Sequence, residues 1–166
     1  MDIYLNFDGV LHPDHLLYER GCAPSLLTSE HSALEYAGCL VAALESHVDA
    51  AIVLNTWWTF YLGLDACIEM LPPALAARVI GSTVQHASTY DQIPTRHREV
   101  ERYIARRRHQ AFLIVDHANA RYSRDLSPFL LLLDPLEGLS NPTTCRSLKR
   151  RIELLQNFPN CALPFS

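Results

Sequence analysis

Short runs of apolar residues alternate along this chain with longer segments in which apolar residues recur at helical spacing. The apolar runs are rich in Ile, Val and Leu, which is typical of strands buried on both faces of a sheet. They cover residues 3–5, 50–54, 111–115 and 129–133, and residues 78–81 have the length of a short edge strand. This alternation predicts parallel strands joined by crossover helices, and therefore a three-layer α/β sandwich with a parallel, Rossmann-like sheet.

The helical segments are delimited by capping residues and prolines. Ser32 and Glu35 have the spacing of a capping box, and Thr95 precedes a strongly polar segment as an N-cap residue does. Pro72 and Pro73 end the helical spacing of the second segment. The predicted helices cover residues 32–47, 59–70 and 96–108, and a terminal helix begins at Thr143 or Thr144.

The predicted elements form one unit. No linker or repeat divides residues 1–158, so we expect a single domain there, followed by an irregular tail over residues 159–166. A chain of 166 residues with 49% hydrophobic content can bury a sizeable core. Its net charge of −4 gives no general attraction to nucleic acid or to an anionic membrane, although a local basic patch is compatible with it.

Cysteine usage and the lack of long apolar runs bear on the cellular compartment. The five cysteines are odd in number and show no Cys-x-x-Cys spacing, so we expect reduced, mostly buried thiols. No apolar run reaches membrane-spanning length, and polar residues interrupt the N-terminal segment where a signal peptide would be apolar. These features predict a cytoplasmic protein with no membrane partner.

Polar side chains gather where the predicted strands end. Asn6 and Asp8 follow the first strand, Thr56 follows the second and Asp116 follows the third. Arg96 opens a predicted helix, where its guanidinium can donate two hydrogen bonds to a phosphate. Because the carboxyl ends of parallel strands lie at one edge of a sheet, we expect these side chains to converge in one crevice.

Each of these positions also has an ordinary structural explanation. Asn6 can begin a turn, and Thr56 can be a routine residue at a strand end. Arg96 and Arg98 can belong to a solvated helix face, and His117 can be a satisfied loop histidine. The motifs are individually short, so their order along the chain has to decide between the two interpretations.

The first thirteen residues resemble motif I of the haloacid dehalogenase (HAD) superfamily, Asp-x-Asp-Gly-x. In that family the first Asp attacks phosphorus and the second is the general acid and base; this chain has Asn6 and Asp8 in those places. Thr56 resembles the motif II hydroxyl, Arg96 the motif III cation and Asp116 the motif IV acid. Since the matches occur in the family's order, the chain is identified as a small HAD-like protein.

The resemblance implies a phosphomonoester hydrolase lineage with a Mg²⁺ site. Asn6, Asp8, Thr56 and Arg96 take the catalytic places, with Asn6 standing at the nucleophile position. The metal positions are Asn6, Asp8, Asp116 and His117, and the substrate-binding positions are Gly9, Asn55 and Arg98. No large insertion follows motif I or separates motifs II and III, so the resemblance implies no large cap domain. An uncapped site is open to a phosphorylated small molecule or a nucleic-acid end.

Two positions depart from the family pattern. The Asn6 amide is neutral and is not a competent nucleophile, and His117 replaces an acid that often helps to hold Mg²⁺. Each change removes one negative charge, so we expect Mg²⁺ to bind weakly or not at all, and hydrolysis to be weak or absent. The alternative is a non-catalytic module that binds a phosphate ligand or a partner. Asn6 is either natural or engineered to trap a complex; the second departure, at His117, favours natural divergence.

Overall fold

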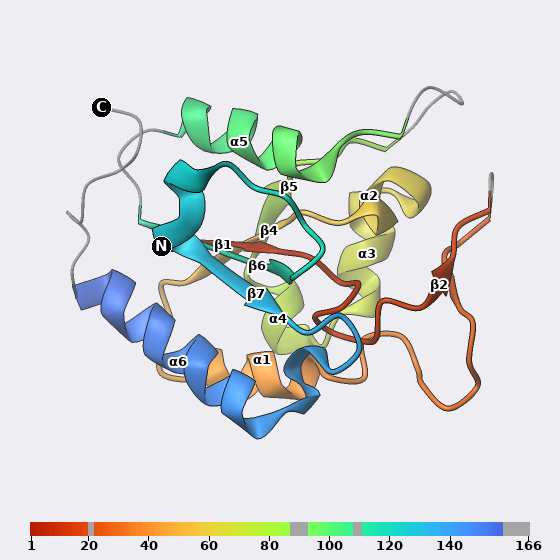
Figure 1. The fold of residues 1–166 in the computed structure, drawn as a ribbon, viewed down its shortest axis with the longest axis horizontal. Coiled ribbons are helices and arrows are strands. Elements are labelled where there is room, and N and C mark those ends of the chain that lie inside the picture. The colour runs from red at the N-terminus through yellow and green to blue at the C-terminus, as the bar shows by residue number, and fades with distance from the viewer. Residues whose placement is uncertain (20–21, 87–92, 108–110, 158–166) are drawn as a thin grey trace.

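The computed structural model describes residues 1–19, 22–86, 93–107 and 111–157. Its centre is a sheet of five parallel strands in the order β5-β4-β1-β6-β7 (Figure 1). The strands are β1 (Asp2–Leu5), β4 (Ala51–Leu54), β5 (Val79–Ser82), β6 (Phe112–His117) and β7 (Leu130–Leu133). The predicted parallel α/β fold is confirmed, and each apolar run of the sequence forms one strand.

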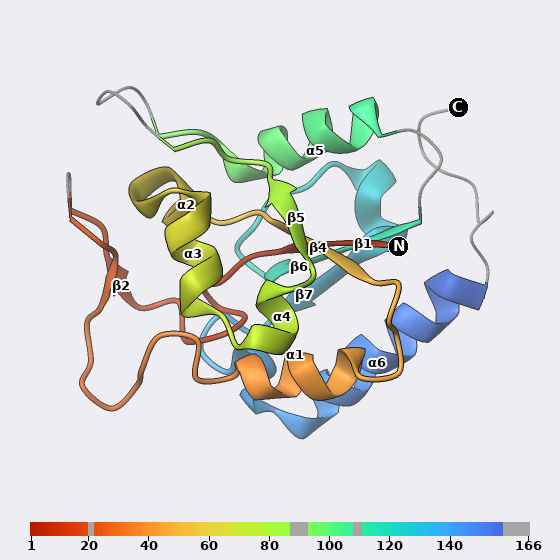
Figure 2. The ribbon, with the colours of Figure 1, turned by 180° about the vertical axis from the view of Figure 1, so that it is seen from behind.

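Helices cover both faces of the sheet. Helices α1 (Ala37–Leu44) and α6 (Pro142–Asn157) lie on one face, and α5 (Arg96–Arg106) lies on the other (Figures 1 and 2). The short helices α2 (Trp57–Leu62), α3 (Leu64–Met70) and α4 (Pro73–Ala76) connect β4 to β5, and η1 (Arg124–Phe129) precedes β7. No helix in the described ranges is long and apolar enough to cross a membrane.

The central strand β1 shows how the two faces are filled. Ile3 and Leu5 belong to a large apolar cluster with residues of α1 and α6, whereas Tyr4 belongs to a smaller cluster with residues of α5 and η1. Alternate side chains of a strand point to opposite faces, so the sheet separates the two clusters. Since β4 and β6 flank β1 with parallel register, all four residues of β1 are buried.

A small hairpin occupies the connection between β1 and α1. Its antiparallel strands, β2 (Leu16–Leu17) and β3 (Ser25–Leu26), lie between the first predicted strand and the helix predicted over residues 32–47. Figure 1 shows the hairpin projecting beyond the carboxyl ends of the sheet strands. A short 3-10 helix, η2 (Gly138–Ser140), lies between β7 and α6. The described residues contain no large cap domain, as predicted.

Two predicted helices differ most from the helices of the structure. Helix α1 begins at Ala37 rather than at residue 32, because the preceding segment is tied to the N-terminal motif: the N–H of Leu34, at φ +60°, donates to Nδ1 of buried His12 over 3.2 Å. The helix predicted over residues 59–70 is divided by Gly63, whose φ of +86° ends α2 and allows the turn into α3. Both differences come from local backbone conformations that periodicity does not reveal.

The prediction of reduced thiols is wrong for two cysteines. Cys39 of α1 and Cys145 of α6 form a disulfide that links positions 106 residues apart. Helices α1 and α6 pack against each other only in the folded chain, so the spacing along the sequence gave no sign of this pair. Cys67 is a buried free thiol, Cys22 is exposed, and Cys161 lies outside the described residues, as does the predicted tail.

Candidate functional site

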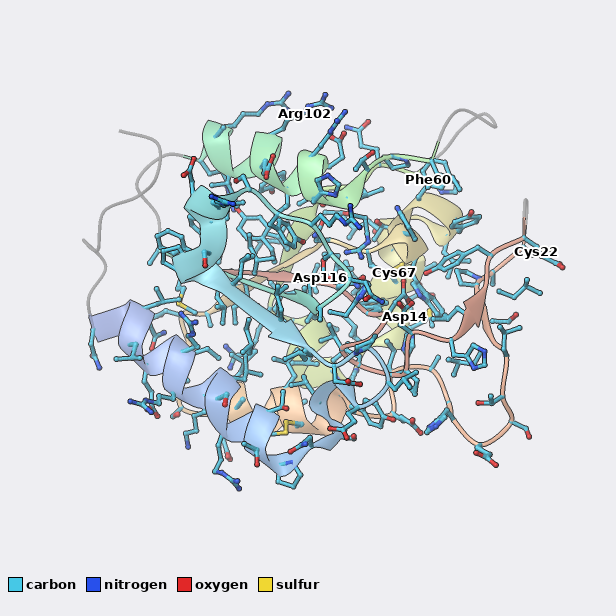
Figure 3. The ribbon with its side chains drawn as sticks, viewed as in Figure 1. Asp14, Cys22, Phe60, Cys67, Arg102 and Asp116 are labelled. Carbon is cyan, nitrogen blue, oxygen red and sulfur yellow. A yellow bond between two sulfur atoms is a disulfide. The ribbon has the colours of Figure 1, made fainter. Side chains whose placement is uncertain are left out.

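The predicted site residues come from three neighbouring strands and one helix. Asn6 follows β1, Thr56 follows β4, Asp116 lies near the end of β6, and Arg96 is the first residue of α5. All four side chains are buried. Because the strands are parallel, the structure brings these residues to one edge of the sheet; Figure 3 shows Asp116 in that region, close to Asp14 in the view.

Asn6 is locked in one orientation. Its Nδ2 donates to the carbonyl oxygen of Asp8 over 2.7 Å and to Oδ1 of Asp116 over 2.9 Å. Both partners are acceptors, so the amide nitrogen has to face them. The remaining atom, Oδ1, is buried and has no hydrogen-bond partner in the part of the chain that the structure describes. The amide therefore directs a donor, not an anionic oxygen, toward Asp116.

Asp116 is neutralised by Arg96. Nη1 of Arg96 lies 2.6 Å from Oδ2 of Asp116, which also accepts from the Tyr122 hydroxyl over 2.7 Å. Oδ1 accepts from Asn6 and from the backbone N–H of His117. Burial alone would lower the pKa of Arg96, but the adjacent Asp116 carboxylate raises it above its usual value. The guanidinium thus remains charged and forms a buried ion pair.

Asp8 is held by hydrogen bonds instead. Its Oδ1 accepts from Trp58 Nε1 over 2.7 Å and lies 3.2 Å from His12 Nε2, and its Oδ2 accepts from the Tyr18 hydroxyl. Nδ1 of His12 accepts from Leu34, so Nε2 carries the ring proton of the neutral form. Burial would raise the pKa of Asp8, but the hydrogen bonds from His12, Tyr18 and Trp58 outweigh it and keep the pKa below its usual value.

Thr56 and Asn55 organise the end of β4. Thr56 Oγ1 accepts from the N–H of Trp58 over 3.3 Å and caps α2. Asn55 accepts from Thr83 over 2.7 Å through Oδ1, and its Nδ2 donates to the hydroxyl of Tyr122 over 3.1 Å. Asn55 thereby supports the tyrosine that contacts Asp116. The predicted roles of Thr56 and Asn55 toward a phosphate stay predictions.

A cavity of about 590 Å³ opens beside these residues. Its lining includes Asp8, Asp14, Trp57, Arg96, Asp116 and His117. The other predicted residues do not line it: Asn6, Asn55 and Thr56 are buried, and Arg98 is exposed on α5. Gly9 packs so closely that a Cβ there would lie 2.7 Å from Cβ of His117.

Sequence reasoning missed four residues of this region. His12, Tyr18 and Trp58 surround Asp8, and Asp14 lines the cavity. Trp58 lies four positions after the end of β4 and two after Thr56, which is a usable signal. Tyr18 comes from the hairpin and His12 from the turn after β1, where no pattern indicated that their side chains reach the site.

The arrangement does not fit a Mg²⁺ site. Both oxygens of Asp8 already accept hydrogen bonds, and both oxygens of Asp116 are engaged by Arg96 and its other donors. Asn6 directs its amide nitrogen, which cannot bind a metal, toward Asp116. Across the described ranges, no group of three or more His, Cys, Asp or Glu side chains is placed to hold a metal ion. A guanidinium provides the positive charge beside Asp116.

The fold and the ordered motifs define a HAD-like protein of phosphoesterase lineage. The model of the family described as "HAD domain in Swiss Army Knife RNA repair proteins" matches residues 3–144, and the chain belongs to that family. No curated protein and no solved structure matches the chain. The family match covers every site residue discussed above and ends just before Cys145.

Proposed function

We propose that this protein binds a phosphate monoester at the carboxyl edge of its sheet and hydrolyses it slowly or not at all. The observation that supports the proposal is the amide of Asn6, which hydrogen bonds to Asp8 and Asp116 fix at the place that the resemblance assigns to the nucleophile. An amide oxygen is neutral and delocalised, so it cannot attack phosphorus as a carboxylate does. Covalent catalysis is therefore lost, while Arg96 remains beside the cavity.

The protonation state of Asp8 also argues against efficient hydrolysis, because it concerns proton donation to the leaving group. A general acid has to carry a proton when the leaving group departs. The pKa of Asp8 is held below its usual value because donors from His12, Tyr18 and Trp58 outweigh the effect of burial, so Asp8 is ionised at neutral pH. Proton donation by Asp8 would require these contacts to break. Nucleophilic attack and proton donation are therefore both weakened, which favours a binding role.

The cavity suits a ligand larger than a free phosphate. It has a volume of about 590 Å³, and Trp57 and Arg121 belong to its lining. The guanidinium of Arg96 lies 5.2 Å from the centroid of the Trp57 ring, so a cation and an aromatic surface are adjacent. Nucleic-acid ends combine a phosphate with bases that stack on aromatic side chains. Together with the RNA-repair description of the family, this favours an RNA end with a terminal phosphate.

Binding can be tested with short oligoribonucleotides that carry a phosphate at the 5′ end, at the 3′ end or at neither. Fluorescence anisotropy should show that one phosphorylated form binds at least tenfold more tightly than the unphosphorylated form. Arg96→Ala should abolish this preference. Arg102→Ala is the matched control, because Arg102 lies on the same helix and is exposed, away from the cavity (Figure 3). Equal binding of all three oligonucleotides would contradict the proposal.

Hydrolysis is tested separately with a generic aryl phosphate in the presence of Mg²⁺. The parent protein should be slower than Asn6→Asp by several orders of magnitude, on the order of 10⁴ by comparison with knockouts of catalytic nucleophiles. Efficient hydrolysis by the parent would show that another group replaces the nucleophile. If Asn6→Asp is also inactive, a second departure such as His117 limits turnover.

A further inference from the structure

His117 has a buried ring nitrogen that no described residue hydrogen-bonds. The residue is 8% exposed, and its Nδ1 makes no hydrogen bond with the described residues. Oδ2 of Asp14 lies 3.7 Å from this nitrogen, beyond hydrogen-bonding distance. Buried polar atoms are almost always satisfied, so an unsatisfied one beside a cavity calls for an explanation. His117 and Asp14 both belong to the cavity lining.

The contacts of the ring decide which nitrogen carries the proton. Nε2 of His117 lies 3.3 Å from Nη2 of Arg96, and a guanidinium can only donate. Nε2 therefore accepts, and the neutral ring carries its proton on Nδ1. The backbone N–H of His117 is bound to Asp116, and Cβ of His117 packs against Gly9. The ring is thus held in place with its Nδ1, unpartnered among the described residues, 3.7 Å from Oδ2 of Asp14.

We infer that His117 is a direct phosphate ligand and that phosphate binding is independent of Mg²⁺. This inference rests on the proposed function and names a residue through which the protein binds phosphate. Nδ1–H of His117 donates to a phosphoryl oxygen that replaces the Asp14 carboxylate in front of it. Arg96 supports the same anion, because its buried Nε also lacks a hydrogen-bond partner within the described ranges. The position at which HAD proteins often carry a metal-binding acid has become a position that binds the phosphate itself.

The charges around the cavity fit this exchange. Asp116 is already neutralised by Arg96, so it does not need a metal ion to tolerate an incoming anion. Asp14 is the carboxylate that stands closest to Nδ1, and its side chain is 30% exposed, so it can swing toward solvent. Burial, opposed by His117, raises the pKa of Asp14, which shows that its charge is poorly stabilised where it stands. Asp8 remains as the second negative group of the lining.

Titration calorimetry with inorganic phosphate tests the inference, in EDTA and in Mg²⁺. The parent protein should bind phosphate with the same affinity, within about twofold, in both buffers. His117→Phe removes the donor at similar size and should weaken binding by about tenfold to a hundredfold, the range for a hydrogen bond to a charged group. His117→Asn places an amide N–H near the position of Nδ1 and should retain binding within about threefold of the parent.

Asp14→Asn should change the affinity for phosphate in the opposite direction. Removing the competing carboxylate should tighten phosphate binding by about threefold to tenfold, since like charges near one site repel. Nitrogen NMR of the histidine rings in the parent protein adds a readout that needs no variant. Phosphate should shift the resonance of the protonated Nδ1 of His117, in EDTA as well as in Mg²⁺.

The outcomes separate the inference from the proposed function. Phosphate binding that disappears in EDTA, or that is unchanged in His117→Phe, would overturn the inference while leaving phosphate binding intact. The absence of phosphate and phosphorylated-oligonucleotide binding in every buffer would overturn both. If His117→Phe does not fold, an unmoved Nδ1 resonance in phosphate-bound parent protein would still reject the inference.

Discussion

The α1–α6 side of the molecule and the carboxyl edge of the sheet are held together by different means. On the α1–α6 side, buried Leu40, Leu44, Leu148 and Ile152 belong to the large apolar cluster, and a disulfide links the two helices. At the carboxyl edge, hydrogen bonds and an ion pair link buried charged and polar groups to one another. Three of the four buried side-chain atoms without a partner in the described residues lie there: Asn6 Oδ1, Arg96 Nε and His117 Nδ1. Apolar packing and a covalent bond stabilise the α1–α6 side, whereas the edge keeps buried polar atoms that no described residue satisfies, as the proposed binding role requires.

The largest effect expected at the edge follows the removal of Arg96. Arg96→Ala leaves Asp116 as a buried, unpaired carboxylate, so the free energy of unfolding should fall by about 3–5 kcal/mol in urea denaturation. Arg102→Ala removes an exposed pair with Glu99 and should change it by less than about 1 kcal/mol. Adding Asp116→Asn to Arg96→Ala should restore part of the loss. Equal losses of unfolding free energy in the two arginine variants would contradict the prediction that the buried ion pair contributes more stability than the exposed pair.

The α1–α6 side should respond most to loss of the disulfide. Replacing Cys39 and Cys145 together by Ala should lower the free energy of unfolding by about 2–4 kcal/mol, because the bond constrains the unfolded chain. Phosphate affinity should stay unchanged, since neither residue lines the cavity. Cys22→Ala, at an exposed position, is the control. A double variant that keeps its stability but loses phosphate binding would reverse the assigned roles of the two regions.

Asn6→Asp should lower the free energy of unfolding while it introduces a carboxylate that can act as a nucleophile. It replaces a donor by a carboxylate beside Asp116, so we expect unfolding to become easier by roughly 1–3 kcal/mol without metal. Mg²⁺ that binds only the folded state should recover part of this loss, most clearly when His117→Asp is added. Thermal melts of the parent should show little Mg²⁺-dependent shift. A large shift in the parent that Asp8→Ala abolishes would mean that its remaining oxygens do hold the metal.

The smallest effect concerns the pH dependence of stability at Asp8. The folded-state pKa is lowered because the hydrogen bonds to Asp8 outweigh burial, so its contribution is fully present above the unfolded value of about 3.9. That contribution is lost as the pH falls through the lower, folded-state pKa. The stability difference between the parent and Asp8→Asn should therefore shrink in acid. The exposed Asp65→Asn should show no such convergence; a constant difference for Asp8→Asn would refute the prediction.

The sheet and the meeting of its strand ends could be predicted from the sequence. The strands β1, β4, β6 and β7 are continuous apolar runs, and the parallel arrangement brings Asn6, Thr56 and Asp116 to the same edge. The structure also places Arg96 at the start of α5, where it was expected. These features follow from local sequence patterns and from general rules of topology, so they can be predicted from a single sequence.

The partners of the site residues could not be predicted in the same way. Tyr18 reaches Asp8 from a hairpin of two-residue strands, and His12 contacts the backbone of Leu34, which delays the start of α1. Cys39 and Cys145 meet because two helices pack. Such contacts depend on how distant segments fold onto each other. The pairing of Arg96 with Asp116 belongs to the same class, although both residues were recognised.

Both tryptophans of the chain lie at the carboxyl edge. Trp58 donates its indole N–H to Asp8, and Trp57 lines the cavity with the Arg96 guanidinium over its ring. The intrinsic tryptophan emission of the protein therefore originates entirely from this region. Phosphate or an RNA end that alters the charge near either indole should change the intensity or wavelength of that emission, so an unlabelled sample in a fluorimeter reports directly on occupancy of the cavity.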